Sequence, residues 1–179
     1  MASQTSVKLT YEDFAAIPDD GLRHEVIDGE HYVNPSPNLR HQLVSIRLAS
    51  ALFTFVTGHG LGHVFHAPLD VLLSKHDIVE PDIIFVSNAN AHILTEPNIQ
   101  GTPDLLIEIL SMDRDYDRKK KYRLYERTGV SEYWIVDPFE DAVEIYRRHD
   151  ATFARIDAAD TLTTPLLPGF TLPLRELFA

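Results

Sequence analysis

Two acidic residues stand at positions where apolar residues surround them. Glu108 interrupts the apolar run 105–110 (sequence LLIEIL), and Asp82 follows Pro81 directly before the apolar run 83–86. A buried carboxylate is strongly disfavoured unless it is paired, neutralised or bound to a cation. Glu108 therefore either lies at a strand end or pairs with a basic residue, or it binds a metal ion. Asp82 either caps N–H groups at the start of a strand or provides a second metal ligand.

The metal interpretation makes a geometric prediction about these two carboxylates. Oxygen ligands from two neighbouring strands would form half of an octahedral site for Mg²⁺ or Mn²⁺, with water and a substrate phosphate completing the shell. We therefore expect Asp82 and Glu108 on adjacent strands, with both side chains on the same face of the sheet.

A basic segment follows Glu108 in the sequence. It holds seven of the 16 basic residues against three acidic ones, so it is locally +4 in a chain of net charge −11; the seven are Arg114, Arg118, Lys119, Lys120, Lys121, Arg123 and Arg127. A solvated helix face with an Asp117–Lys121 pair would explain one pair but not the reversal of sign. A basic helix beside a metal site would instead position phosphate and stabilise the charge that develops in an in-line displacement.

Helical patterns frame these residues. Thr10 is a candidate N-cap for a short helix that ends before Pro18, and apolar spacing predicts a long helix over 39–56, closed by Gly58. A charged helix is expected over 115–128, ended by Gly129, and a last helical turn over 174–178. The segment 58–62 is interpreted as a helix-ending loop.

Strand patterns account for most of the remaining chain. Asp28-Gly29 predicts an N-terminal hairpin between 22–28 and 30–34. Buried strands are expected at 68–74, 82–87, 104–110 and 132–137, and an outer, C-terminal hairpin at 142–147 and 152–156. The core order is thus helix, three strands, helix, strand. This predicts an α/β fold with a mixed central sheet flanked by helices, in a single domain over 1–179.

Composition excludes several classes of protein. The chain has 179 residues and no cysteine, which excludes disulfide frameworks, thiolate zinc sites and cysteine nucleophiles. Its net charge of −11 argues against a protein that binds polyanions with its whole surface. The first ten residues lack a basic start and an apolar core, and no apolar stretch could span a bilayer. We expect a cytoplasmic protein with no membrane partner.

Pro81-Asp82, followed by Glu108 on this order of elements, resembles the PD-(D/E)XK nuclease superfamily. More narrowly, the run 101–138 (GTPDLLIEILSMDRDYDRKKKYRLYERTGVSEYWIVDP) resembles the bacterial Uma-two family of restriction-endonuclease domains. The run 11–30 (YEDFAAIPDDGLRHEVIDGE) is also similar to that family, so the resemblance extends over about 9–150. It implies the restriction-endonuclease-like fold.

The resemblance also implies roles for individual residues. Asp82 and Glu108 match the metal-binding acidic pair, but the position where the superfamily usually has its basic residue is Leu110 here. Within the narrower family the lysine lies on the following helix in a D-x-x-x-K-x-x-x-Y pattern, which Asp117, Lys121 and Tyr125 match. Lys121 is therefore the candidate catalytic lysine. Glu25 matches an early glutamate of the family; the alternative is a half-exposed hairpin residue.

These expectations converge on metal-dependent hydrolysis of phosphodiester bonds in DNA, by an endodeoxyribonuclease that uses Mg²⁺ or Mn²⁺. The candidate catalytic residues are Asp82, Glu108, Lys121 and Glu25, and the first two are the metal ligands. The expected partners are DNA and a second copy of the chain in a homodimer. The alternative is a catalytically silent module that binds nucleic acid or takes part in assembly on the same fold, which the displaced lysine and the negative net charge favour.

Overall fold

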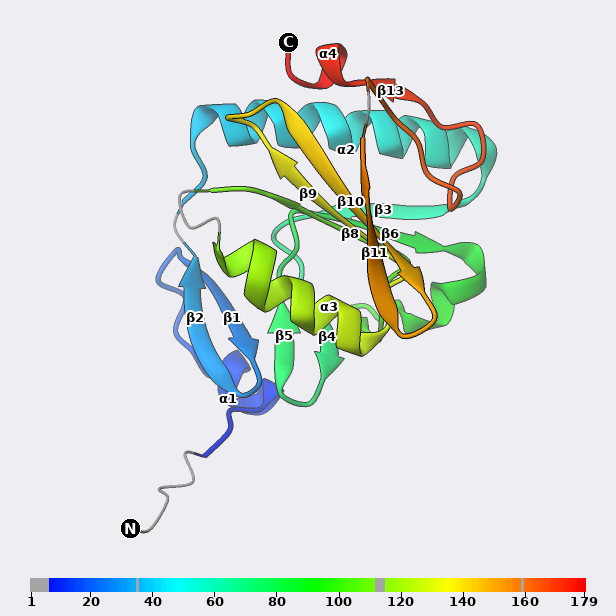
Figure 1. Ribbon diagram of the computed structural model, residues 1–179. Coiled ribbons are helices and arrows are strands. Elements are labelled where there is room, and N and C mark those ends of the chain that lie inside the picture. The colour runs from blue at the N-terminus through cyan, green and yellow to red at the C-terminus, as the bar shows by residue number, and fades with distance from the viewer. Residues whose placement is uncertain (1–6, 35, 112–114, 159) are drawn as a thin grey trace.

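A six-stranded mixed sheet forms the centre of the molecule (Figure 1). The computed structural model describes residues 7–34, 36–111, 115–158 and 160–179. The sheet has the strand order β11-β10-β9-β8-β6-β3. Its strands are β3 (Gly62–His66), β6 (Ile83–Ser87), β8 (Leu105–Ile109), β9 (Glu132–Asp137), β10 (Ala142–His149) and β11 (Thr152–Asp157). Only β8 and β9 pair in parallel; the other neighbours are antiparallel.

Helices cover both faces of this sheet, which explains why its central strands are apolar throughout. Successive residues of a strand point to opposite faces. Ile83 and Phe85 of β6 pack with helix α2 (Leu39–His59), whereas Ile84 and Val86 pack with helix α3 (Tyr122–Thr128) on the other side. The predicted mixed sheet flanked by helices is confirmed.

The long helix α2 begins and ends on identifiable caps. The side chain of Asn38 accepts a hydrogen bond from the His41 N–H at 2.9 Å. Gly60 ends the helix with φ 62°, a left-handed conformation that glycine adopts without strain. The predicted helix over 39–56 is confirmed, and it continues for one further turn.

A second, five-stranded sheet lies beside the first and has the order β2-β1-β5-β4-β7. Its strands are β1 (Arg23–Ile27), β2 (Glu30–Asn34), β4 (Val71–Ser74), β5 (Asp77–Val79) and β7 (Ile99–Gln100). The predicted N-terminal hairpin is β1–β2, and Asp28 and Gly29 both have positive φ (55° and 80°) in its two-residue turn. Short helix α1 (Tyr11–Ala15) precedes this hairpin, as predicted.

The sequence assigned one strand to the wrong sheet. The predicted strand 68–74 corresponds to β4, which forms a hairpin with β5 in the second sheet. The first strand of the central sheet is instead β3, where only a helix-ending loop had been expected over 58–62. As an edge strand with exposed histidines, β3 has no continuous apolar run that would identify it.

The remaining elements refine two predictions. The C-terminal hairpin β10–β11 is confirmed, but it extends the central sheet as its edge rather than lying outside it. The charged helix over 115–128 begins as a π-helical segment, η2 (Tyr116–Lys121), and continues as α3. The smaller elements are η1 (Asn88–Ile93), β12 (Thr161–Leu162), β13 (Leu172–Pro173) and α4 (Leu174–Leu177). Arg114 lies outside the described residues.

None of the helices in the described ranges combines the length and the apolar character that crossing a membrane requires.

Candidate active site

Asp82 and Glu108 lie opposite each other on two neighbouring strands. The antiparallel register pairs Ile83 of β6 with Ile107 of β8, which places Asp82, directly before β6, across from Glu108. The Ile109 N–H donates a hydrogen bond to Asp82 Oδ2 at 2.8 Å. Both carboxylates are almost completely buried, and both line a pocket of about 120 Å³. Asp82 therefore also caps an N–H group, as the alternative interpretation of this residue expected.

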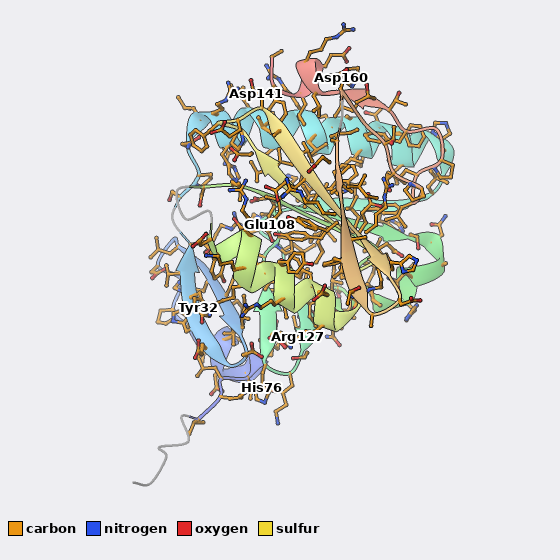
Figure 2. The ribbon with its side chains drawn as sticks, viewed as in Figure 1. Tyr32, His76, Glu108, Arg127, Asp141 and Asp160 are labelled. Carbon is orange, nitrogen blue, oxygen red and sulfur yellow. The ribbon has the colours of Figure 1, made fainter. Side chains whose placement is uncertain are left out.

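Lys121 extends from the helical segment above the sheet to Glu108. Its ammonium Nζ lies 2.9 Å from Glu108 Oε1 and 2.9 Å from Glu25 Oε1, and its side chain is only 2% exposed. The Tyr125 hydroxyl donates to Glu108 Oε1 at 2.7 Å, and Asp117 Oδ1 lies 3.8 Å from Nζ. Asp117, Lys121 and Tyr125 thus lie together over Glu108, which Figure 2 labels near the start of this helix.

The π-helical geometry of η2 determines which residues of this segment meet. In an α-helix, residues five apart point about 140° away from each other, because each residue turns about 100°. Closing the turn on residue i+5 brings them to one face. Tyr116 and Lys121 both reach Glu25: the Tyr116 hydroxyl donates to Glu25 Oε2 at 2.8 Å, and Nζ lies 5.4 Å from the centre of the Tyr116 ring.

Glu25 is completely buried on β1, rather than half-exposed on its hairpin. Besides Lys121 and Tyr116, it accepts hydrogen bonds from the Glu80 N–H at 2.8 Å and from Asn34 Nδ2 at 2.6 Å. Burial disfavours its charge, but Lys121 and these donors together lower its pKa. Glu25 is therefore an ionised carboxylate, and it binds Lys121 from a buried position outside the pocket lining.

Arg23 and His41 were not predicted, although both contact Asp82. Arg23 Nη1 donates to Asp82 Oδ1 at 3.0 Å, and His41 Nε2 lies 3.2 Å from Asp82 Oδ2. Burial opposes ionisation of Asp82, yet His41, Arg23 and the Ile109 N–H lower its pKa to about 2. Arg23 precedes Glu25 by two residues on one strand, so the period of a strand could have placed them on one face. His41 carries no comparable signal in the sequence.

The charge balance of this cluster is negative. Burial raises the pKa of Glu108 to about 8, and Asp117, Asp82 and Glu25 act in the same direction, against the attraction of the Lys121 ammonium. The excess of carboxylates in a buried space means that an added cation would be stabilised here.

Two of the carboxylates in this pocket have the chemistry of divalent-metal ligands. The described residues contain no group of three or more His, Asp or Glu that could enclose a metal ion. Mg²⁺, however, is usually held by one or two carboxylates, with water and phosphate completing its shell. Asp82 and Glu108 fit that mode. Among the described residues Glu108 Oε2 has no hydrogen-bond partner, and the pocket of about 120 Å³ has room for several waters.

Much of the basic segment is neutralised by the protein itself. Arg118 binds Glu144 and Asp137, and Arg127 binds Asp77 and Asp28. Lys119, Lys120 and Arg123 lie on the outside: Lys119 pairs with Asp115 at 2.7 Å while remaining 68% exposed, and Lys120 contacts Tyr32 and lies 3.7 Å from a carboxylate oxygen of Glu30. These three residues present the outward positive charge of this helical segment, and Asp115 and Glu30 offset part of it.

Comparison with known proteins agrees with this architecture. The family model Uma2, described as "Putative restriction endonuclease", matches residues 11–175. A crystal structure from Anabaena variabilis ATCC 29413, titled a "putative nuclease belonging to DUF820", superposes with a TM-score of 0.78 at 23% identity. The alignment covers 95% of this chain and 97% of that one, which shows a shared fold. No curated protein matches the chain.

Proposed function

The chain belongs to the Uma2 family, and we propose that it is a metal-dependent nuclease that hydrolyses phosphodiester bonds in DNA. The observation that supports this most is the position of one buried ammonium group. Lys121 Nζ lies 2.9 Å from Glu108, in the pocket that Glu108 shares with Asp82. Two acidic oxygen donors and a fixed cation in one pocket are the groups that phosphodiester hydrolysis uses.

Asp82 and Glu108 are the proposed ligands of Mg²⁺ or Mn²⁺. When bound, such an ion polarises the scissile phosphate and lowers the pKa of a coordinated water. Asp82 is kept ionised by Arg23, His41 and the Ile109 N–H, so it presents a negative charge to the pocket at any physiological pH. Glu108 has an oxygen, Oε2, directed to no donor among the described side chains, whereas Oε1 is held by Lys121 and Tyr125.

Lys121 is proposed to act as a permanent cation rather than as a base. Burial opposes its charge, but the carboxylates of Glu108, Glu25 and Asp117 raise its pKa above the ordinary value. It therefore keeps its proton and donates hydrogen bonds. In this role it orients a nucleophilic water and stabilises the negative charge that develops on the phosphate in the transition state. Glu25 is a positioning residue, because it contacts Lys121 and does not line the pocket.

DNA and a second copy of the chain are the proposed partners. A chain of net charge −11 repels a polyanion over most of its surface, so binding must be local to the pocket and to the outward residues Lys119, Lys120 and Arg123. Three cations give only a few phosphate contacts. Two copies would double them, which is the reason for proposing a homodimer.

A substrate panel tests this proposal. Double-stranded DNA, single-stranded DNA and RNA are incubated with the protein in Mg²⁺ or Mn²⁺, with Glu108→Ala as the inactive control. We expect cleavage of DNA by the wild-type chain only. Cleavage by Glu108→Ala at the wild-type rate would reject the site, and cleavage of RNA alone would reject DNA as substrate.

One observation favours the alternative, a module that binds without catalysis. Both oxygens of Asp82 already accept hydrogen bonds, from Arg23 on one side and from the Ile109 N–H on the other, so this carboxylate is stable without a metal. If the wild-type chain cleaves nothing in either metal but retains DNA in a salt-dependent filter-binding assay, the binding module is correct.

A further inference from the structure

The outer face of α2 carries a row of exposed apolar side chains. Leu39 is 86% exposed, Phe53 57%, Ile46 58% and Leu43 52%, although large apolar residues are ordinarily buried. They lie opposite the buried face of the same helix, which packs on the central sheet. We call this row, together with Ser50 and Thr57, the α2 stripe.

The α2 stripe has the spacing of a helix-packing seam. Its members stand at positions 39, 43, 46, 50, 53 and 57, so the steps alternate between four and three residues. This is the heptad pattern with which one helix packs along another at a shallow angle. The described part of the chain places no helix against it, because the C-terminal segment contacts α2 on a different flank, where Arg47 donates to the Leu177 carbonyl.

No charged residue belongs to this face. The two arginines of α2 turn away from it: Arg40 binds Asp141 and the Pro138 carbonyl, and Arg47 binds the carbonyls of Leu177 and Ala179. Charged residues make up 24% of this chain, so an exposed helix face without a charged residue is unusual. Such a face is the kind of surface that a partner covers.

We infer that the α2 stripe is the surface on which a second copy of this chain docks, an inference that rests on the homodimer proposed above, with the two α2 helices packed antiparallel about a twofold axis. Two copies that each carry a charge of −11 repel each other least where the surface between them is free of carboxylates, and this face is such a surface. The same net charge disfavours anionic lipid and nucleic acid as occupants of an apolar strip.

A twofold axis through the middle of α2 makes the stripe complementary to itself. With the axis at position 48, Ile46 of one copy faces Ser50 of the other, and Leu39 faces Thr57, so in these two pairs a bulky side chain meets a small one. In the third pair Leu43 faces Phe53, and both side chains are apolar. Helices interdigitate when large side chains on one pack against small side chains on the other. A twofold interface uses the same patch on both copies.

The size of the face fits a reversible dimer. A helix of 21 residues is about 32 Å long and 10–12 Å wide, so the two faces together cover about 700 Å². A specific interface generally needs about 1,000 Å². A shallow hollow of about 500 Å³ beside the stripe, lined by Thr54, Phe55 and Phe170 among others, provides further contact area for the ends of the partner helix. We therefore expect a weak dimer in exchange with the monomer.

Sedimentation velocity over a concentration series tests the inference. The wild-type chain should pass from monomer to dimer, and Ile46→Glu should weaken the dimer by about tenfold or more, because it places two like charges near the axis. Ile156→Glu is the matched control: it replaces another exposed apolar residue, on β11, and should leave dimerisation unchanged. Ile46 is exposed, so the variant should fold, which circular dichroism checks.

A distance measurement tests the antiparallel arrangement independently. The chain has no cysteine, so a single nitroxide can be attached at Gly58→Cys, where an added Cβ meets nothing within 4 Å. Pulsed electron paramagnetic resonance should give about 30–35 Å between the two labels, whereas parallel helices would bring them within about 20 Å.

Three results would overturn the inference. The first is a chain that stays monomeric at all concentrations. A monomer that co-sediments with phosphatidylcholine vesicles would count as the same result. The second is a dimer that Ile46→Glu leaves intact, which would place the interface elsewhere. The third is a short label distance in the dimer.

Discussion

Lys121 is held by two carboxylates on different strands, and this explains why it stays buried with its charge. Glu25 contributes from β1 and Glu108 from β8, each at 2.9 Å from Nζ. An uncompensated ammonium in this position would be strongly disfavoured. The pair of glutamates thus compensates the buried charge of Lys121. In the proposed function this lysine takes the place of the one that the superfamily pattern has at position 110 of the strand.

Glu25→Gln tests the contribution of the hidden glutamate. All four contacts of Glu25 are donors, so the amide nitrogen of glutamine would face a donor and leave buried groups unsatisfied. We expect a loss of about 1–3 kcal/mol in the free energy of unfolding, measured by urea titration. Glu30→Gln on the exposed neighbouring strand should change it by less than about 0.5 kcal/mol. Equal effects of the two variants would contradict the buried role of Glu25.

At the scale of secondary-structure elements, η2 is the feature that the sequence did not indicate. The charged pattern over 115–128 predicted a helix, but nothing in residue types distinguishes a π turn from an α turn. The D-x-x-x-K-x-x-x-Y pattern of the family resemblance implies that Asp117, Lys121 and Tyr125 act together, whereas the contact of Tyr116 with Glu25 depends on the wide π turn.

Inserting one alanine after Lys119 tests whether the register of the π turn positions the site. Lys119 is exposed, so the insertion costs little packing, but Tyr116 and Lys121 then stand six residues apart and the added residue turns them about 100° further from each other. We expect a folded protein with a lower melting temperature and no cleavage activity. Lys119→Ala keeps the chain length and should retain cleavage. An insertion variant as active as the wild type would show that the register of the π turn is incidental.

A second element-scale prediction concerns the contact between β5, the β1–β2 hairpin and α3. Asp77 is almost completely buried and accepts hydrogen bonds from Arg127, from the Asp28 N–H and from Ser74. Burial opposes its ionisation, but these donors lower its pKa below the ordinary 3.8. Because the folded-state pKa is depressed, its stabilisation is present above about pH 4 and is lost as the pH falls through the folded-state pKa.

Urea unfolding of Asp77→Asn at two pH values measures this effect. At pH 7 the variant should be less stable than the wild type by about 1–3 kcal/mol, since an amide is a weaker acceptor for Arg127. At pH 3 the difference should shrink, because this pH lies below the ordinary pKa of 3.8: the unfolded wild-type chain then binds a proton at Asp77 that the folded chain must release to keep the contact. A difference that is constant between pH 7 and pH 3 would contradict the charged contact.

At the scale of the whole molecule, the sequence predicted the core elements from 82–87 onward but assigned the first core strand wrongly and missed the division into two sheets. Long apolar runs such as 105–109 and 132–137 identify central strands, because both of their faces are buried. Short strands such as Asp77–Val79 have no periodicity to detect, and the polar edge strand Gly62–His66 resembles a loop. The candidate pair of Asp82 and Glu108 could be proposed from their apolar surroundings, whereas Arg23 and His41 lie near Asp82 only because the second sheet and α2 meet there.

Metal binding should be visible in the stability of the whole chain. A ligand that binds only the folded state at 100 times its Kd stabilises it by about 2.7 kcal/mol, which for a chain of this size corresponds to a rise in melting temperature of roughly 5–10 °C. Millimolar Mn²⁺ should produce such a rise in the wild type and a much smaller one in Asp82→Asn, measured by differential scanning fluorimetry. Equal shifts in both proteins would mean that Mn²⁺ binds elsewhere.

The central claim is that Lys121 serves the reaction itself, and cleavage of DNA by Lys121→Ala tests it most directly. The assay follows DNA cleavage in Mn²⁺ by the wild type, Lys121→Ala and Lys119→Ala, alongside the Mn²⁺-dependent shift in melting temperature of each. We predict that Lys121→Ala loses cleavage by about 100-fold or more while retaining the Mn²⁺ shift, since its ammonium acts on the transition state. Lys119→Ala should cleave nearly as fast as the wild type, with slightly weaker, salt-dependent binding. Cleavage by Lys121→Ala at the wild-type rate would contradict the account.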